Sequence, residues 1–191
     1  MSFLVLGLIL FLGTHSIRLV ADGWRTALVG RLGLNRWKGL YSLVSALGLG
    51  LIVWGYGLAR AEPVELWAPP TWTRHVAALL TLPAFILITA AYVPGSRIKA
   101  AIGHPMVAGV KVWAIAHLLS NGNLADVLLF GAFLLWAVLD FRSARQRDRA
   151  AGRVYRPGTV ARDGLVVAVG AGVWALFAGF LHLWLIGVLP Y

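Results

Sequence analysis

The chain contains six apolar segments, each close to the length that an α-helix needs to cross a membrane. A transmembrane helix takes about 20 predominantly apolar residues to span ~30 Å of hydrocarbon. The segments lie near residues 2–21, 39–59, 75–93, 104–120, 123–141 and 164–189. The chain is 60% hydrophobic and 13% charged, with a mean hydropathy of +0.80, which is too apolar for an ordinary soluble domain. We therefore predict an all-α fold, a polytopic membrane helix bundle of about six transmembrane helices that forms a single domain over residues 1–191.

The basic residues are concentrated between alternate spans. The first, third and fifth connections carry thirteen of the 17 lysines and arginines, namely Arg25, Arg31, Arg36, Lys38, Arg97, Lys99, Arg142, Arg145, Arg147, Arg149, Arg153, Arg156 and Arg162. The even connections carry only Arg60 and Arg74. Because lysine and arginine accumulate in cytoplasmic loops, we predict that the odd connections are cytoplasmic and that both termini lie outside. The net charge of +10 does not indicate nucleic-acid binding, since no polar domain is left to bind nucleic acid.

The residue types available for metal binding are few. The chain has no cysteine, which excludes disulfides, thiolate ligands and covalent haem attachment through Cys-x-x-Cys-His. Zinc and di-iron sites usually take three or four ligands, often carboxylates, whereas Asp22, Asp126, Asp140 and Asp163 all lie close to the ends of spans. Haem iron needs only one or two axial histidines in an apolar slot, and this chain can supply them.

Glycines recur at intervals of seven residues in two of the spans. The pairs are Gly48 with Gly55, Gly50 with Gly57, and Gly172 with Gly179. Small residues that repeat on one face of a membrane helix let a neighbouring helix approach closely. We interpret these glycines as packing positions.

Two spans carry ionisable side chains. The segment from Gly103 to Asn123 is predicted to be an apolar helix that carries Lys111 and His117, and the first span carries His15 with Arg18 about one turn later. An ionisable group inside a membrane is costly unless it faces the bundle interior and finds a partner, so these residues are functional candidates. The simpler interpretation is that the two cations reach the inner interface along their own stems and that the histidines are hydrogen-bonded packing residues.

Helix geometry leaves the partner of His117 open. His104 lies thirteen residues away, about 20 Å along a helix with a rotation of roughly 220°, so His104 and His117 cannot bind one ion. The span boundaries favour His182 as the partner by depth. If Arg18 and Lys111 both mark the inner interface, His15 lies at a similar depth to His117 and becomes the partner. His75 is predicted to be solvated at the outer interface.

Two motifs are similar to those of a known family. They are Gly103-His104-Pro105-Met106 with Gly109, Trp113, Ala116-His117 and Asn121-Gly122, and Thr14-His15-Ser16-Ile17-Arg18 in the first span. The chain resembles the NnrU family of bacterial membrane proteins, which is related to the zeta-carotene isomerase of plants and cyanobacteria. The resemblance covers most of the chain in span order. Its most specific part is the thirteen-residue step from the His-Pro pair to the Ala-His pair.

The resemblance implies haem b held between membrane helices. His15 and His117 would be the axial iron ligands, and His104 would serve activity without binding the iron. If haem is held in this way, we expect Arg18 and Lys111 to neutralise its propionates, a role that arginine suits through bidentate pairing. The NnrU family is associated with denitrification. The resemblance therefore implies a protein of the bacterial inner membrane that acts as a redox or nitric-oxide-responsive accessory of nitrite or nitric oxide reduction.

Two alternatives stay open. One is a haem-dependent cis–trans isomerase that acts on a polyene such as 15-cis-zeta-carotene. Isomerase relatives are longer, with an added N-terminal segment, whereas this chain begins in its first span, which favours the bacterial branch. The other alternative is a non-haem membrane scaffold or small transporter. The expected partners are membrane lipid, nitric oxide or a carotenoid, and other membrane proteins.

Overall fold

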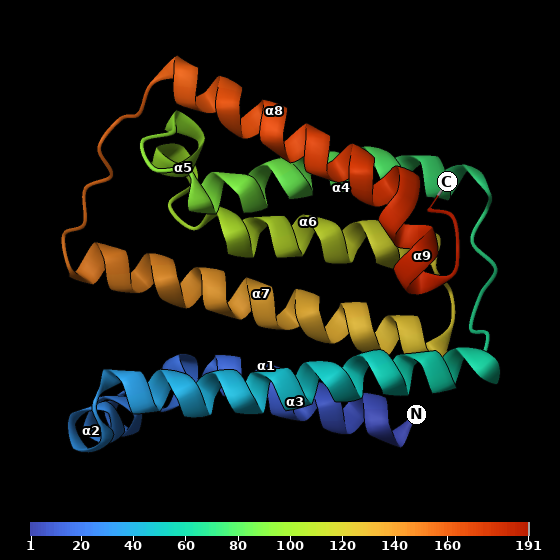
Figure 1. The fold of residues 1–191 in the computed structure, drawn as a ribbon, viewed down its shortest axis with the longest axis horizontal. Helices are drawn as coiled ribbons and strands as arrows, with labels where there is room; N and C mark the ends of the chain where they lie inside the picture. The colour runs from blue at the N-terminus through green and yellow to red at the C-terminus, as the bar shows by residue number, and fades with distance from the viewer. Residues whose placement is uncertain (191) are drawn as a thin grey trace. The chain divides into compact units, whose positions relative to one another are not determined.

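The computed structural model describes residues 1–190, which form helices joined by connections and contain no strand (Figure 1). The helices are α1 (Ser2–Val20), α2 (Asp22–Leu32), α3 (Leu34–Ala61), α4 (Trp72–Tyr92), α5 (Arg97–Ile102), α6 (Pro105–Ser120), α7 (Leu124–Ala150), α8 (Val160–Leu176), the π-helical turn η1 (Phe177–Leu181) and α9 (His182–Ile186). The predicted all-α fold is confirmed.

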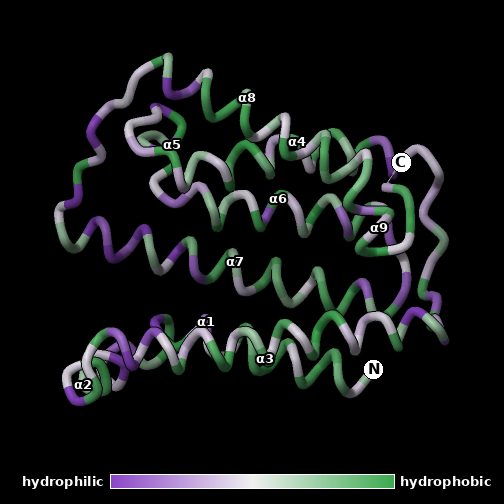
Figure 2. Tube along the Cα trace, in the orientation of Figure 1, coloured by the Kyte–Doolittle hydropathy of each residue, from purple (hydrophilic) through white to green (hydrophobic). Residues whose placement is uncertain are grey.

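Within the described residues, five segments are long and apolar enough to cross a membrane, namely α1, α3, α4, α7 and the run Val160–Ile186 that comprises α8, η1 and α9. The fourth predicted span, near residues 104–120, is α6, which is apolar but has only 16 residues. It starts with Pro105 in its first turn and ends before Asn121, as the sequence indicates. Figure 2 shows hydrophobic residues along the long helices and hydrophilic ones in the last turns of α7. The chain is therefore a multi-span helical membrane protein.

Three stretches predicted as connections contain helix, namely residues 22–32 (α2), residues 97–102 (α5) and the residues of α7 beyond 141. Residues 22–32 form α2, whose first residue, Asp22, lies 3.8 Å from Arg18 Nε and 3.9 Å from Arg25 Nη1. An acidic residue in the first turn is favourable at the positive end of the helix dipole. Helix α7 continues to Ala150, beyond the predicted end of its span. Its last turns contain arginine and alanine, which are strong helix formers, and Arg147 Nη1 donates to Ser143 Oγ over 2.5 Å.

The chain divides into two compact units, each described by itself. The first unit contains residues 1–67 and 123–132, and the second contains residues 68–122 and 133–191. Helix α7 therefore begins in the first unit and ends in the second. In the first unit α1 packs along α3, and Tyr56 Oη donates to the buried Asp126 carboxylate over 2.5 Å. Asp126 Oδ2 also accepts from the backbone N–H and the Nδ2 of Asn123, both at 3.1 Å.

Glycine determines how closely α1 and α3 approach. A Cβ atom at Gly7 would lie 2.6 Å from Ile52 N, and one at Gly48 would lie 2.7 Å from Phe11 N. Gly55 packs in the same way against the Leu4 backbone. The packing role predicted for the pair Gly48 and Gly55 is confirmed.

The packing role predicted for the other two glycine pairs is wrong. Apart from its adjacent residues and the backbone of its own helix, no atom of residues 1–190 lies within 4 Å of a Cβ position at Gly50, Gly57, Gly172 or Gly179. Seven-residue spacing places a pair of glycines on one face of a helix, but it does not decide which face meets a neighbour.

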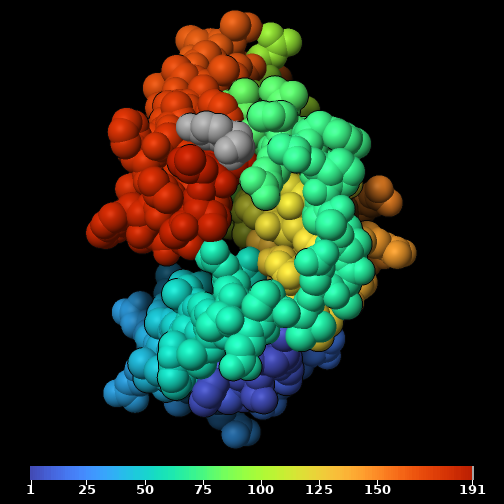
Figure 3. Space-filling model, turned by 90° about the vertical axis from the view of Figure 1, so that its right-hand side faces the viewer, coloured from blue at the N-terminus to red at the C-terminus, as the bar shows by residue number. Residues whose placement is uncertain are grey.

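In the second unit α4 packs between α6 and α8, with which it makes its most extensive contacts. Gly109 of α6 lies against the Ala84 carbonyl, and Gly170 of α8 lies against Ile86. The C-terminal segment lies at the surface of this unit, red in Figure 3, where Trp184 is 80% exposed. Exposed apolar side chains of this kind are expected where a helix faces lipid.

Candidate functional site

His15 lies on α1 with a defined ring orientation. Its Nδ1 is 2.7 Å from the carbonyl oxygen of Phe11, one turn earlier, and its ring stacks on the Phe11 ring at a centroid distance of 4.2 Å. The Tyr41 ring from α3 also meets the His15 ring in an edge arrangement, at a centroid distance of 5.2 Å. Because a carbonyl oxygen only accepts, Nδ1 must carry the hydrogen. In the neutral ring, the lone pair is then on Nε2.

His117 shows the same arrangement on α6. Its Nδ1 is 2.8 Å from the carbonyl oxygen of Trp113, and its ring lies against Trp113 at 5.1 Å. Trp113 in turn meets the Phe133 ring of α7 edge-on at 5.6 Å. The backbone N–H and the Nδ2 of Asn121 both donate to the His117 carbonyl, at 3.0 and 2.9 Å, and close the end of the helix. Nε2 of His117 is therefore also the basic nitrogen of the neutral ring.

The two predicted ligands thus have the same ring orientation, with Nδ1 donating to the carbonyl oxygen one turn earlier. One of them lies in each unit. His15 belongs to the first unit and His117 to the second. The rival candidate His182 also donates through Nδ1, but its acceptor is the carbonyl of Val188, six residues later, and this hydrogen bond is exposed. His75 lies in the first turn of α4. Among residues 1–190, no group of three or more His, Cys, Asp or Glu side chains could hold a metal ion.

The two cations predicted to assist a cofactor have partners of their own. Arg18 is close to the end of α1, with its side chain 57% exposed and Nε 3.8 Å from Asp22 Oδ1. An exposed ion pair of this kind contributes little to stability, so Arg18 can exchange partners at small cost. Lys111 Nζ lies 3.6 Å from the centroid of the Phe141 ring, a cation–π contact between α6 and α7.

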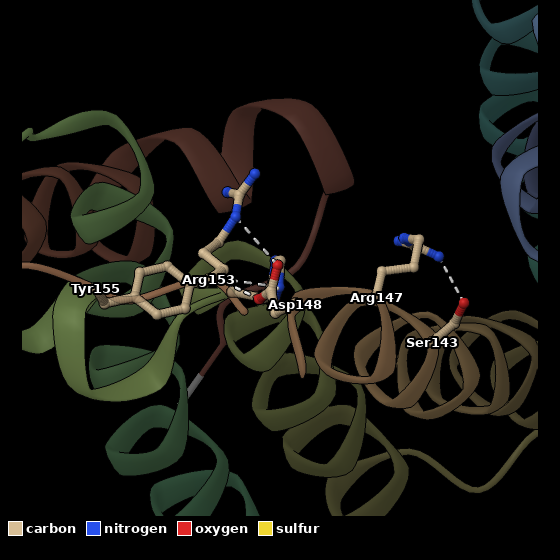
Figure 4. A network of polar contacts seen from close by, with 6 residues as sticks. Ser143, Arg147, Asp148, Arg153 and Tyr155 are labelled. Carbon is tan, nitrogen blue, oxygen red and sulfur yellow. Dashed lines mark hydrogen bonds and ion pairs between the residues drawn. The ribbon is translucent and has the colours of Figure 1, made fainter. Parts of the chain in front are cut away.

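His104 has a different environment from the other two predicted site residues. It is the N-cap residue of α6, and its Nε2 is 2.7 Å from Asp148 Oδ2 near the end of α7. The Tyr155 hydroxyl donates to the same carboxylate oxygen, and Arg153 Nε lies 3.3 Å from Oδ1. In Figure 4, Arg153 and Tyr155 reach Asp148 from the connection after α7, while Arg147 turns away toward Ser143.

The Gly-His-Pro motif has a local structural explanation. Gly103 ends α5 with a φ of +79°, a conformation that favours glycine. A Cβ atom there would also lie 2.9 Å from Arg145 Nη1 and 3.1 Å from the Tyr155 ring. Pro105 then starts α6 with φ already suited to a helix. The two flanking residues therefore fix the backbone from which the His104 side chain reaches Asp148.

Sequence reasoning missed Asp148, Arg153 and Tyr155. One signal was available, because Asp148 is the only acidic residue between Arg142 and Arg162. A single acid in a basic run is a candidate for ion pairing. Nothing local to the sequence connects it to His104, which is 44 residues away.

The fold and these side chains define a class, an integral membrane helix-bundle protein with single, oriented histidines on two of its apolar helices. The family model described as NnrU protein matches residues 3–190. The chain therefore belongs to the NnrU family, as its motifs predict. No curated protein and no solved structure matched the chain.

Proposed function

We propose that this protein binds haem b through His15 and His117 and supports denitrification in the bacterial inner membrane, as a redox or nitric-oxide-responsive accessory of nitrite or nitric oxide reduction. Membership of the NnrU family supports the class of function. The observation that carries the proposal is that His15 and His117 make the same hydrogen bond. In each, Nδ1 donates to the carbonyl oxygen one turn earlier, at 2.7 and 2.8 Å.

The donor set fits haem iron. Metal-binding histidines usually donate their second ring N–H to a carbonyl or carboxylate, which fixes the tautomer, orients the ring and makes the ligating nitrogen more basic. His15 and His117 both meet this condition and so present Nε2 as the donor atom. That both histidines bind the same iron comes from the family resemblance. Haem, when bound, supplies one-electron redox chemistry and an iron that binds nitric oxide.

Neighbouring groups hold each histidine in place, and a cation lies near each of them in the sequence. His15 is held by a stacked ring, a ring edge and a short hydrogen bond. His117 sits two turns after Gly109, where α6 is pressed against α4. Arg18 lies about one turn beyond His15 and Lys111 lies six residues before His117. A cation at these positions suits haem propionates, and arginine can pair bidentately with a carboxylate.

The decisive experiment is a visible absorption spectrum of the detergent-purified protein in its oxidised and reduced forms. We expect the bands of low-spin haem with two nitrogen ligands. His15→Ala and His117→Ala should each lose most of the haem or the low-spin bands, while His75→Ala and His182→Ala keep both. A colourless wild-type protein expressed with ample haem, or loss of haem in His182→Ala but not in His15→Ala, contradicts the ligand assignment.

The physiological role needs a separate measurement. In a denitrifying bacterium that lacks this gene, consumption of nitrite and nitric oxide under anaerobic growth should fall. The wild-type chain should restore it, whereas His117→Ala should not. Equal restoration by both would mean that haem binding, if present, does not serve denitrification.

A further inference from the structure

The ring nitrogens of His104 are arranged in the opposite way to those of His15 and His117. Nε2 of His104 is 2.7 Å from Asp148 Oδ2, whereas the Tyr155 hydroxyl is 3.4 Å from the same nitrogen and donates instead to the carboxylate. A carboxylate accepts only, so the short contact requires a hydrogen on Nε2. In the neutral ring of His104, the lone pair is therefore on Nδ1.

We propose that His104, Asp148 and Tyr155 form an acid–base triad, in which Nδ1 of His104 takes up and releases a proton while Asp148 and Tyr155 are positioning residues. A histidine whose other nitrogen is fixed by a carboxylate is oriented for proton transfer, because the carboxylate selects one tautomer and stabilises the imidazolium. The triad lies wholly within the second unit and needs no haem, so it goes beyond the proposed function.

The charges around His104 make Asp148 the decisive partner. His104 lies at the positive end of α6, where the helix dipole favours a negatively charged group nearby. Arg145 beside Gly103 and Arg153 on Asp148 Oδ1 add positive charge. The remaining ring neighbours are the edges of Phe141 and Tyr155, at 6.3 and 6.4 Å. Among these groups, Asp148 supplies the negative charge that balances a proton on Nδ1.

The triad is positioned between water and the protein interior. The His104 side chain is 26% exposed and that of Asp148 only 12%. The imidazole can therefore exchange a proton with water, while the carboxylate is shielded by its three donors. Burial and the hydrogen bond to Asp148 raise the pKa of Tyr155, which keeps its hydroxyl protonated as a donor. In the proton step, a hydronium ion gives one proton to Nδ1 and leaves water, and the reverse step returns it.

The helix itself supplies a control. Ser143 and Arg147 form a hydrogen-bonded pair four residues apart on α7, and Arg147 directly precedes Asp148 in the sequence. Arg147→Gln removes a positive charge and a hydrogen bond from the same helix end without touching the triad. Any effect of Asp148→Asn that Arg147→Gln does not reproduce is therefore specific to the His104 contact.

The experiment is nitrogen NMR of the full chain labelled with ¹⁵N in its histidine rings, in detergent micelles. A ring nitrogen that carries a hydrogen resonates far from one that carries a lone pair, so each tautomer is read directly. His104→Gln assigns the His104 signals. His15 and His117 are internal references, because their hydrogens are predicted on Nδ1.

We expect His104 alone of these three to carry the hydrogen of its neutral ring on Nε2 and to accept a second hydrogen on Nδ1. Asp148→Asn should shift His104 toward the other tautomer, Tyr155→Phe should do so to a smaller extent, and Arg147→Gln should leave it unchanged. Unaltered His15 and His117 signals would show that the variants fold. The proposal is overturned if wild-type His104 carries its hydrogen on Nδ1, if Nδ1 never takes up a proton, or if Asp148→Asn in a folded chain leaves the tautomer unchanged.

Discussion

The contact between α1 and α3 gives a prediction in which neighbouring glycines on one helix respond in opposite directions. In Gly48→Ala, the new methyl group would lie 2.7 Å from the backbone nitrogen of Phe11, whereas ordinary contact begins at 3.4 Å. Since the obstacle is backbone, α1 must retreat by about 0.7 Å. Overpacking of this kind costs about 1–3 kcal/mol. For a chain of this size, that corresponds to a fall in Tm of roughly 2–12 °C.

Gly50→Ala is the matched control, since it lies on the same helix two residues further on. Nothing lies within 4 Å of its Cβ position. Alanine is favoured over glycine in a helix interior by about 0.5–1 kcal/mol, so Gly50→Ala should leave Tm unchanged or raise it by a few degrees. Gly57→Ala should behave like Gly50→Ala, and Gly55→Ala like Gly48→Ala.

The assay is thermal unfolding in one detergent, followed by loss of the monodisperse peak in size-exclusion chromatography. The displaced residue, Phe11, also stacks on the His15 ring and accepts its hydrogen bond. A retreat of α1 should therefore weaken haem retention in Gly48→Ala but not in Gly50→Ala. Equal Tm values for the two variants would refute the inference that glycine sets the distance between α1 and α3.

Three further predictions follow, two from side-chain contacts and one from the distribution of basic residues. Tyr56→Phe removes the hydroxyl that donates to buried Asp126 and should cost about 1–3 kcal/mol; its Tm should fall, while that of Tyr92→Phe, whose side chain is 71% exposed, should not. The pKa of Tyr155 is raised by burial and by its bond to a carboxylate, so the neutral phenol is favoured in the folded state. Its contribution to stability is complete below the unfolded-state pKa and is lost as the pH rises through the raised value, and its ¹³C phenol signal should titrate at higher pH in the folded chain than in the unfolded chain. Reporter fusions should place Gly152 in the cytoplasm and the C-terminus outside; a cytoplasmic C-terminus would contradict the orientation derived from basic residues.

Much of the fold was predictable because a membrane span is a local feature of the sequence. About 20 apolar residues in succession identify a span without knowledge of its neighbours. The prediction failed where charged stretches between the apolar segments were taken to be loops. Helix α2 and the last turns of α7 are rich in arginine, which favours a cytoplasmic location and is also a good helix former. Basic composition is a criterion for the side of the membrane, which stays a prediction here, and not for the backbone conformation.

The histidines themselves were predictable, but their environments were not. A lone histidine in an apolar span is visible in the sequence and is a functional candidate by default. Which ring nitrogen carries the hydrogen depends on the acceptor that it meets. For His15 and His117 that acceptor is the carbonyl one turn earlier, a local contact. For His104 it is a carboxylate 44 residues away, and such a pairing requires the folded chain.

The two buried carboxylates of α7 show why residue type alone did not decide function. Asp126 and Asp148 are both buried, and each accepts a hydrogen bond from a tyrosine hydroxyl of its own unit. A buried carboxylate is costly unless it is hydrogen-bonded or paired. Asp126 is satisfied by Tyr56 and by two N–H groups of Asn123, none of which takes up a proton near neutral pH, so it caps α7 and fastens it to α3. Asp148 is satisfied in part by the imidazole of His104, which can take up a second proton. The same residue type therefore has two roles on one helix. Asp126 anchors one end of α7, Asp148 belongs to an acid–base site at the other end, and the difference lies in their hydrogen-bond partners.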